Sequence, residues 1–373
     1  MRKIIILGAT GSVGNSALEL IQANPEKFQI VGASSHHHFT ELQSIAKDFS
    51  IPHLLNTNEK HYFPDFLDQC QPDIVLNAIS GFAGLPYSIQ ILESGTPLAL
   101  ANKESLVAGG ELLMALSRTK KTSIYPVDSE HSAIWQCLQN HDPGIRDLKS
   151  RDQKHPFKKI LLTCSGGPFR ERKDFSTVTK SEALTHPTWS MGGKITIDSA
   201  TLANKCLEVF EAMHLFGASK DQIEIIIHPQ SIVHSMVQFS DSSIIAQISP
   251  PNMKLPIAYA LNYPNCDDYK LEEVDFSNLT LNFSNPDKKK FRTLQMLDIC
   301  IREMQNFPIV FNAANEIAVS AFLEGKISFV QIFDVLEKII DETKKETIET
   351  FEQIQRIDAQ TRTKTQSLLP GKI

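Results

Sequence analysis

The sequence has only six cysteines among 373 residues, and no two of them form a Cys-x-x-Cys pair. This spacing argues against a disulfide framework or a cysteine-rich metal site, and free thiols in a reducing compartment are expected. Long apolar runs are also lacking. The first run, Ile4–Leu7, is far too short for a signal peptide, and no run approaches a membrane span. The sequence therefore predicts a cytoplasmic protein without a membrane partner.

An excess of positive charge is lacking as well. The chain has 37 lysines and arginines against 43 aspartates and glutamates, which gives a net charge of −6. This balance argues against nucleic-acid binding. What the chain does have is 42% hydrophobic residues and a length that fits two or three domains. We therefore expect a multidomain globular protein whose substrate is a small molecule.

The beginning of the chain indicates a dinucleotide-binding fold. The apolar run Ile4–Leu7 is typical of a buried parallel strand, and a helical pattern follows it up to Ile21. Between the two lie Gly8, Gly11 and Gly14. Glycines let the backbone approach a pyrophosphate, whose charge is attracted by the N–H groups at the helix start. A tight turn without a ligand is the less favoured interpretation.

The second predicted strand, residues 28–35, favours NADP over NAD. In NAD sites this strand usually ends in an acidic residue that binds the ribose 2′-hydroxyl. Here it ends in two serines, followed by His36, His37 and His38. Hydroxyls and imidazoles suit a 2′-phosphate better than a free hydroxyl. The alternative for the three histidines is a solvated loop.

Strands and helices continue to alternate up to residue 130, with strands predicted within 72–79, 96–105 and 122–130. Polar side chains gather where two of these strands end, since Asn102, Lys103 and Glu104 follow one and Asp128, Ser129 and Glu130 follow another. Ligands bind at the carboxyl ends of such strands. We expect both groups to face one crevice.

Asp128 and Glu130 are two like charges at the end of a buried strand. They repel each other, and burying either costs several kcal/mol unless a positive charge lies nearby. A third carboxylate, Glu208, lies in a helical pattern with Asn204 and Lys205. Three carboxylates in one crevice suit a hard divalent cation such as Mg²⁺ or Mn²⁺. Alone, Lys205 and Glu208 would read as a surface ion pair.

The region after the polar residues 140–158, where we place a domain boundary near 147, carries an anion-binding pattern. A strand at 160–163 leads into Ser165-Gly166-Gly167, whose hydroxyl and N–H groups can hold an anion, although a plain loop is equally compatible. Residues 186–194, with Trp189 and Gly192, have the composition of a mobile flap or of an ordinary surface loop. We expect Asp198 or Ser199 to cap a helix beginning near Ala200.

The remaining chain predicts two strands joined by a turn at 240–243, one of them an edge strand for dimer pairing, then a surface linker and four helices. The fold class is thus α/β, with a doubly wound NADP-binding domain, an α/β catalytic domain and a C-terminal helical bundle. The expected boundaries are 1–147 for the first, 148–261 for the second, 262–290 for the linker and 291–373 for the bundle.

Seven motifs together resemble the 1-deoxy-D-xylulose 5-phosphate reductoisomerase family. They follow the family's order and spacing over essentially the whole chain: GATGSVG, ANKE, PVDSEH, SGGPF, HPTWSMG, DSATLANKCLE and HPQSIVHSMV. The resemblance implies a homodimer that converts a ketose phosphate to 2-C-methyl-D-erythritol 4-phosphate in non-mevalonate isoprenoid biosynthesis. It implies NADPH and Mg²⁺ or Mn²⁺ as cofactors, with Co²⁺ as a further option.

The same resemblance implies roles for single residues. The metal ligands are Asp128, Glu130 and Glu208. The substrate contacts are Lys103, Ser129, Glu130, Ser165, His186, Ser199, Asn204, Lys205 and Glu208, with Trp189 closing over them. The cofactor contacts are Thr10, Gly11, Ser12, Val13, Asn102, Glu104 and Gly192. This sequence differs from the family at two places that concern cofactor binding. The family often has a Gly-basic-Asn run where this chain has His36–His38, and it commonly has Arg where this chain has Gly193.

Two other functions remain open from the sequence. A semialdehyde dehydrogenase shares the N-terminal fold but needs a cysteine nucleophile, for which Cys164 is the candidate. A non-catalytic NADP sensor would explain the glycine turn but gives no reason for three carboxylates beside an anion-binding turn.

Overall fold

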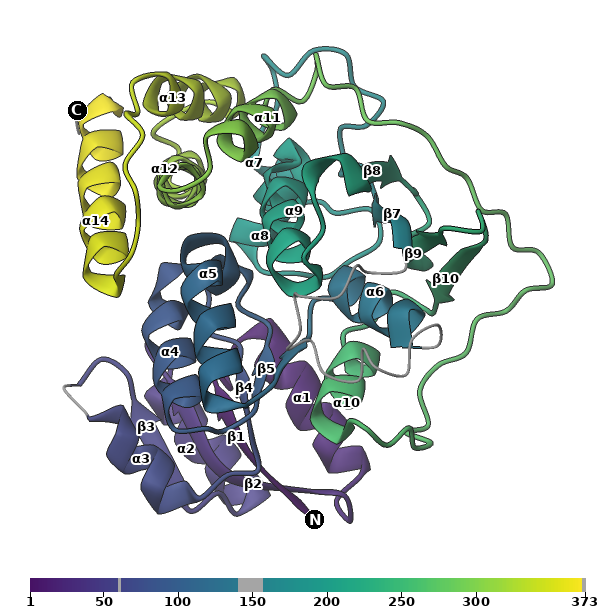
Figure 1. Ribbon diagram of the computed structural model, residues 1–373, viewed down its shortest axis with the longest axis vertical. Coiled ribbons are helices and arrows are strands. Elements are labelled where there is room, and N and C mark those ends of the chain that lie inside the picture. Colours follow the sequence, from purple (N-terminus) through teal and green to yellow (C-terminus); the bar gives the residue numbers. More distant parts are fainter. Residues whose placement is uncertain (60–61, 140–156, 371–373) are drawn as a thin grey trace.

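The computed structural model describes residues 1–59, 62–139 and 157–370. The predicted domain boundary near residue 147 lies outside these residues. Figure 1 shows an N-terminal α/β part, a second sheet with its helices, and a C-terminal group of helices. Within the described part of the chain, no helix is both long and apolar enough to cross a membrane.

The N-terminal part is a doubly wound α/β domain, as predicted. Its strands are β1 (Arg2–Leu7), β2 (Phe28–Ser35), β3 (His53–Asn56), β4 (Ile74–Asn77), β5 (Leu98–Leu100) and β6 (Ile124–Pro126). They form one parallel sheet in the order β3-β2-β1-β4-β5-β6. The four apolar residues of β1 are fully buried, as expected for a central strand covered on both faces. Its helices are α1 (Ser12–Ala23), α2 (Phe39–Phe49), α3 (Phe63–Cys70), η1 (Phe82–Gly84), α4 (Leu85–Glu93) and α5 (Lys103–Lys120).

The glycine turn lies where the strand order reverses, between β1 and β4, which is where such sheets bind their ligands. Gly8 has a φ of +80°, and a Cβ atom there would lie 2.7 Å from the carbonyl oxygen of Ala78. Only glycine fits this conformation and this close approach. Gly11 precedes α1 as its N-cap and makes no side-chain capping hydrogen bond. The first N–H groups of α1 therefore have no side-chain acceptor at the cap.

The second sheet has the order β10-β9-β7-β8. Its strands are β7 (Phe157–Cys164), β8 (Ile223–Ile227), β9 (Val233–Phe239) and β10 (Ile244–Ile248), which confirms the predicted pair of strands around the 240–243 turn. Helix α6 (Ser129–Gln139) packs on β9 and β10. The other helices of this part are α7 (Lys180–Ala183), α8 (Gly193–Thr201), α9 (Ala203–Phe216) and η3 (Lys220–Gln222).

One helix prediction was wrong. Asp198 and Ser199 do not cap a helix near Ala200 but lie inside α8, which already begins at Gly193. Leu202 adopts a left-handed conformation with φ of +60°, and α9 begins after it. The break is therefore made by a leucine, a residue that rarely takes this conformation, so the sequence pattern gave no signal for it.

After the second sheet the chain returns to the first domain. Helix α10 (Lys254–Asn262) packs on α1, and Tyr269 stacks on Phe28 of β2 with ring centroids 6.3 Å apart. The segment that follows runs along the outside of the molecule (Figure 1) and touches the second sheet through the bridge Ile227–Ser284. Helices α6 and α10 therefore connect the two α/β parts, since α6 packs on the second sheet and α10 packs on α1 of the first domain.

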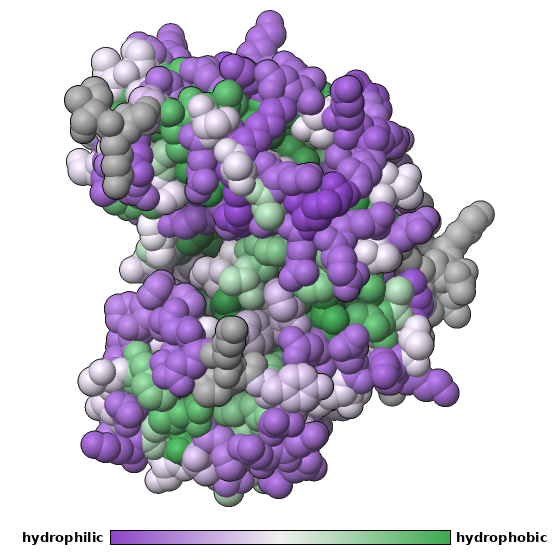
Figure 2. Space-filling model, turned by 90° about the vertical axis from the view of Figure 1, so that its left-hand side faces the viewer, coloured by the Kyte–Doolittle hydropathy of each residue, from purple (hydrophilic) through white to green (hydrophobic). Residues whose placement is uncertain are grey.

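The four predicted C-terminal helices are confirmed as α11 (Thr293–Glu303), α12 (Phe307–Leu323), α13 (Phe329–Asp341) and α14 (Phe351–Leu368). Helix α12 lies at their centre and contacts α5 of the first domain and α8 of the second. Most of its residues are buried, so it is a core helix shared by all three parts. Figure 2 shows a largely hydrophilic face that is hollowed between its upper and lower halves.

Candidate active site

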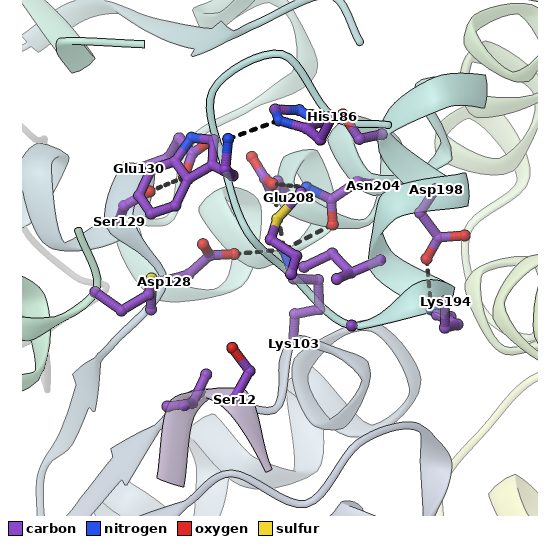
Figure 3. A pocket seen from close by; sticks show the side chains of 18 of the residues that line it. Ser12, Lys103, Asp128, Ser129, Glu130, His186, Lys194, Asp198, Asn204 and Glu208 are labelled. Atoms are coloured by element: carbon purple, nitrogen blue, oxygen red, sulfur yellow. Dashed lines mark hydrogen bonds and ion pairs between the residues drawn. The ribbon is translucent and has the colours of Figure 1, made fainter. Parts of the chain in front are cut away.

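A cavity of about 470 Å³ lies between the first domain and the second α/β part. It is bounded by the starts of α1, α5, α6 and α9, by the Ser-Gly-Gly turn after β7 and by the segment 186–194 (Figure 3). Most of the predicted site residues line it: Gly11, Ser12, Val13, Asn102, Lys103, Glu104, Asp128, Ser129, Glu130, Ser165, His186, Trp189, Gly192, Ser199, Asn204, Lys205 and Glu208.

The other predicted cofactor residues lie outside this lining. Gly8 and Gly14 shape the glycine turn, and a Cβ atom on Gly14 would lie 2.4 Å from the carbonyl oxygen of Gly8. Thr10 Oγ1 lies 3.1 Å from Ser35 Oγ, which ties the turn to the end of β2. His36, His37 and His38 are exposed just beyond that end, and His36 Nδ1 lies 3.0 Å from Thr57 Oγ1.

Sequence reasoning missed several residues of the cavity. Ala78, Ile79 and Ser80 form the loop after β4, and the other missed lining residues include Lys194, Asp198, Ser231, Val233, His234 and Met253. The only sequence signal was the spacing of Lys194 and Asp198, which are four residues apart on one helix face. Their side chains form an ion pair of 2.7 Å, drawn in Figure 3.

The three predicted metal ligands come together. Asp128 precedes α6, Glu130 lies in its first turn, and Glu208 comes from α9. One carboxylate oxygen of each lies within 4.8 Å of the others. Glu208 is completely buried, while Asp128 and Glu130 are 12% and 16% exposed. Figure 3 shows these three side chains around a common space.

Two lysines lie among these carboxylates. Lys103 Nζ is 2.6 Å from Asp128 Oδ2 and 3.2 Å from Glu208 Oε1, and it donates to Asn204 Oδ1 at 2.8 Å. Lys205 Nζ is 2.8 Å from Glu130 Oε1 and also pairs with Glu208. The Lys205–Glu208 pair is therefore a buried one, not the surface pair that its spacing alone would suggest. Two ammonium groups partly neutralise the three carboxylates.

Burial and the neighbouring charges shift the pKa values of these carboxylates in different directions. Burial disfavours ionisation of Glu130, but Lys205 and Lys103 outweigh it and hold its pKa well below the usual range. Burial and the charge of Glu130 raise the pKa of Glu208 to about 7, despite the nearby lysines. Three oxygen donors with unbalanced negative charge fit a hard divalent cation. On the donor chemistry, the residues present fit the predicted Mg²⁺ or Mn²⁺ site.

Two further titratable residues lie behind Asp128. His131 Nε2 lies 2.9 Å from the carbonyl oxygen of Glu208, and its Nδ1 lies 3.5 Å from Glu211 Oε2. Both side chains are buried, and burial lowers the pKa of His131 to about 4. His131 is therefore neutral near pH 7 and supports the backbone of α9 at Glu208.

His186 gathers the hydroxyl groups of the predicted anion site. Its Nδ1 accepts a hydrogen bond from the backbone N–H of Trp189 at 2.9 Å, so the neutral ring carries its proton on Nε2. That Nε2 lies 3.0 Å from Ser165 Oγ and 3.1 Å from Ser199 Oγ. Burial lowers the pKa of His186 to about 4. The serine-containing turn, α8 and the segment 186–194 thus converge on one neutral imidazole.

This lowered pKa predicts a pH effect on stability. As pH falls from about 6.5, the ordinary value, towards 4, the unfolded chain takes up a proton that folded His186 resists, so the protein loses stability. Removing the imidazole removes this loss. We expect the difference in unfolding free energy between wild type and His186→Gln to shrink from pH 7 to pH 5, measured by urea denaturation. A difference that stays constant over this range would contradict the neutral, buried imidazole.

The segment 186–194 covers the cavity with its apolar side chains. Trp189 and Met191 both line the cavity, and the Trp189 ring lies 5.9 Å from the ring of His234. Gly192 and Gly193 are exposed, and no atom lies within 4 Å of a Cβ atom built on Gly192. The segment therefore has an apolar inner side and an exposed glycine at residue 192, a composition that both a flap and an ordinary surface loop can have.

The thiol of Cys164 is poorly suited to nucleophilic catalysis. It lines the cavity, but burial raises its pKa to about 11, with only a partly opposing effect of Lys205. A catalytic cysteine needs a lowered pKa or a neighbouring base to form its thiolate. This environment disfavours the semialdehyde dehydrogenase interpretation.

Models of one protein family match most of the chain. The model described as 1-deoxy-D-xylulose 5-phosphate reductoisomerase matches residues 4–67 and 62–110. The model of that enzyme's C-terminal domain matches residues 124–216, and a model described as the DXP reductoisomerase C-terminal domain matches residues 248–364.

Similar proteins and solved structures point to the same family as these models. The chain is 41% identical over 391 residues to the 1-deoxy-D-xylulose 5-phosphate reductoisomerase of Phocaeicola vulgatus, covering 99% of both chains. It is 38% identical to that of Desulfitobacterium hafniense, covering 99% of this chain and 100% of the relative. A DOX-P reductoisomerase bound to NADPH, fosmidomycin and magnesium superposes with a TM-score of 0.89 at 33% identity over 98% of both chains. The Zymomonas mobilis enzyme with NADPH gives 0.84 at 34% identity over both full chains.

Proposed function

The chain belongs to the 1-deoxy-D-xylulose 5-phosphate reductoisomerase family, and from this premise we propose that the cavity described above is its active site. The reaction is the rearrangement and reduction of 1-deoxy-D-xylulose 5-phosphate to 2-C-methyl-D-erythritol 4-phosphate in isoprenoid biosynthesis. It uses NADPH and a divalent metal ion. The observation that carries the proposal is the meeting of three carboxylates, a serine-histidine anion site and a glycine turn in one cavity.

NADPH is proposed to lie along the first domain. Gly11, Ser12 and Val13 present the start of α1, whose N–H groups suit a pyrophosphate. Asn102 and Glu104, at the start of α5, lie on the same side of the cavity. Asn102 Nδ2 donates to Glu104 Oε2 at 2.9 Å, which fixes both side chains relative to each other. The nicotinamide end of the cofactor would then face the carboxylates across the cavity.

Asp128, Glu130 and Glu208 are proposed to hold the metal ion. When bound, the ion would supply Lewis acidity to the substrate oxygens. The chain itself supplies the fixed geometry, because Asp128 and Glu130 flank the start of α6 and Glu208 lies in the second turn of α9. Lys103 lies between Asp128 and Asn204, within reach of the same substrate oxygens, and keeps a positive charge beside them.

The phosphate of the substrate is proposed to bind between Ser165, Ser199 and His186, with Asn204 and Lys205 at the border to the carboxylates. Lys205 Nζ lies between the carboxylates and the end of β7, since it contacts Glu130 and donates to the carbonyl oxygen of Thr163 at 2.5 Å. Holding the phosphate away from the reacting carbons fixes the orientation of the substrate and reduces the entropy lost on reaching the transition state. Trp189 would close over the bound substrate and exclude water.

The proposal is tested by following NADPH oxidation with 1-deoxy-D-xylulose 5-phosphate after EDTA treatment and after readdition of Mn²⁺. We expect oxidation that depends on both the ketose phosphate and the metal ion. Oxidation that is unaffected by EDTA, or that proceeds equally well without the ketose phosphate, would contradict it.

Recognition of the cofactor 2′-phosphate is proposed for His36, His37 and His38. The two serines before them are engaged elsewhere, because Ser34 Oγ accepts a hydrogen bond from the N–H of Gly8 at 3.1 Å, and Ser35 Oγ accepts one from the N–H of His38 at 3.2 Å. Both serines are at most 2% exposed, whereas all three histidines are exposed. This leaves the imidazoles as the side chains able to reach a phosphate beyond the end of β2.

Replacing the three histidines by alanine should therefore narrow the preference for NADPH over NADH, by about tenfold for the loss of a hydrogen bond to a charged group. Dissociation constants for both cofactors, measured on wild type and on the triple mutant, test this. A mutant with the wild-type NADPH/NADH ratio would refute the role of the histidines.

A cytoplasmic homodimer is proposed as the working form. Strand β10 is the outer strand at one end of the second sheet, and its residues Ile244 and Ile248 are 51% and 36% exposed. An apolar outer strand is suited to pairing with a second copy of the chain, which would cover these side chains.

A further inference from the structure

An acidic side chain of the C-terminal helices contacts the end of a loop that lines the active-site cavity. Glu316 of α12 accepts a hydrogen bond at Oε1 from the backbone N–H of Phe82, with a distance of 3.0 Å. Phe82 directly follows the loop 78–81, whose first three residues line the cavity. The two partners are 234 residues apart in the sequence. A carboxylate of the C-terminal part therefore holds one wall of the cavity.

Glu316 is itself held firmly. Arg362 of α14 donates to its Oε2 at 2.6 Å, and Asn312 donates to its Oε1 at 2.9 Å. Arg362 is fixed in turn by Asp358, one turn earlier on the same helix, at 2.7 Å. The Glu316 side chain is only 16% exposed. Since both carboxylate oxygens have partners, the acceptor offered to Phe82 has a defined position.

The loop 78–81 is in contact with the groups proposed to bind the cofactor. The Gly81 carbonyl oxygen accepts a hydrogen bond from Asn102 Nδ2 at 2.9 Å. At its other end, Ala78 packs against Gly8 so closely that a Cβ atom on Gly8 would lie 2.7 Å from its carbonyl oxygen. A shift of this loop would therefore move both the glycine turn and Asn102.

We propose that Glu316 is a positioning residue for NADPH binding. Through it, the C-terminal helices fix the loop 78–81 and, with that loop, the cofactor side of the cavity. This inference rests on the proposed function, because it takes the glycine turn and Asn102 as cofactor contacts.

A second contact attaches α12 to α8, whose Lys194 also pairs with Glu104 at 3.2 Å. Asn315 Nδ2 donates to Asp198 Oδ1 at 2.8 Å, and Asp198 pairs with Lys194 at the end of the flap. A substitution at Glu316 leaves these contacts in place. The expected effect therefore falls on the cofactor and not on the ketose phosphate, which a general loss of structure would not produce.

Glu316→Ala should weaken NADPH binding about tenfold, the loss expected for a hydrogen bond to a charged group, and should leave KM for the ketose phosphate unchanged. Glu316→Gln keeps an acceptor for the Phe82 N–H and should recover most of the affinity. The control is Glu342→Ala, which removes another ion pair to α14, with Lys364, at a residue that does not line the cavity. It should bind NADPH as wild type does. Fluorescence titration with NADPH measures all four proteins.

Amide hydrogen exchange supplies a readout that needs no ligand. Exchange in the segment 78–84 should become faster in Glu316→Ala than in Glu342→Ala. If Glu316→Ala does not fold, Arg362→Met takes its place in the test. This substitution leaves the Glu316 acceptor but removes the guanidinium that orients it, together with the pair to Asp358, and weaker NADPH binding is again expected. Unchanged NADPH affinity together with unchanged exchange would overturn the inference. A wild-type protein that binds no NADPH would instead overturn the proposed function.

Discussion

Asp128→Asn is expected to lose at least about a hundredfold in kcat/KM, because the Lewis acid lowers the activation barrier by several kcal/mol and depends on all three carboxylates. The substitution keeps the size of the side chain and removes one negative charge from the group formed with Glu130 and Glu208. Lys103 loses its 2.6 Å partner but retains Glu208 and Asn204, so the fold should survive.

Kinetics at limiting and saturating Mn²⁺ measure this effect, with circular dichroism as the check on folding. Asp298→Asn is the matched control, since Asp298 also pairs with a lysine but does not line the cavity. It should retain normal activity. An Asp128→Asn enzyme with near-wild-type activity at limiting Mn²⁺ would show that Asp128 is not a metal ligand.

Lys205→Met is expected to lower the unfolding free energy of the metal-free protein by about 3–5 kcal/mol, the range for breaking a buried ion pair. Lys205 is 2% exposed and pairs with both Glu130 and Glu208, so its loss leaves the buried Glu208 and the partly buried Glu130 with Lys103 as the remaining nearby cation. A divalent ion can replace the missing charge. Mn²⁺ should therefore stabilise this variant more than it stabilises the wild type.

Thermal or urea unfolding with EDTA and with Mn²⁺ tests this. The control is Lys220→Met, whose ion pair with Asp298 is exposed and should contribute at most about 1 kcal/mol. If Mn²⁺ stabilises Lys205→Met no more than wild type, the lysine and the metal ion do not share the same carboxylates. The proposed phosphate role adds a separate expectation, a higher KM for the ketose phosphate with little change in NADPH affinity.

The sequence predicted the parts of the site that depend on local patterns. The buried run Ile4–Leu7 followed by spaced glycines defines its strand, turn and helix within a few residues. Asp128 and Glu130 could be placed in the crevice because strand ends of a parallel sheet meet at one edge. The helical spacing of Lys205 and Glu208 correctly put them side by side, but not their burial, which depends on the packing of α9 against the rest of the fold.

The parts that could not be predicted depend on contacts between distant segments. The pairing of Lys103 with Asp128 and Glu208 joins three elements, and the contact of Glu316 with Phe82 joins residues 234 positions apart. The start of α9 was missed because Leu202 takes a left-handed conformation that its side chain does not favour. None of these three features produces a pattern in the local sequence, because each is determined by the tertiary structure.

The measurement that tests the central claim most directly is the titration of EDTA-treated protein with Mn²⁺, followed by the electron paramagnetic resonance signal of the free ion. The central claim is that Asp128, Glu130 and Glu208 form one divalent-metal site. It predicts that wild type binds one Mn²⁺ per chain and that Glu208→Gln loses this binding. Equal Mn²⁺ binding by wild type and Glu208→Gln would contradict it.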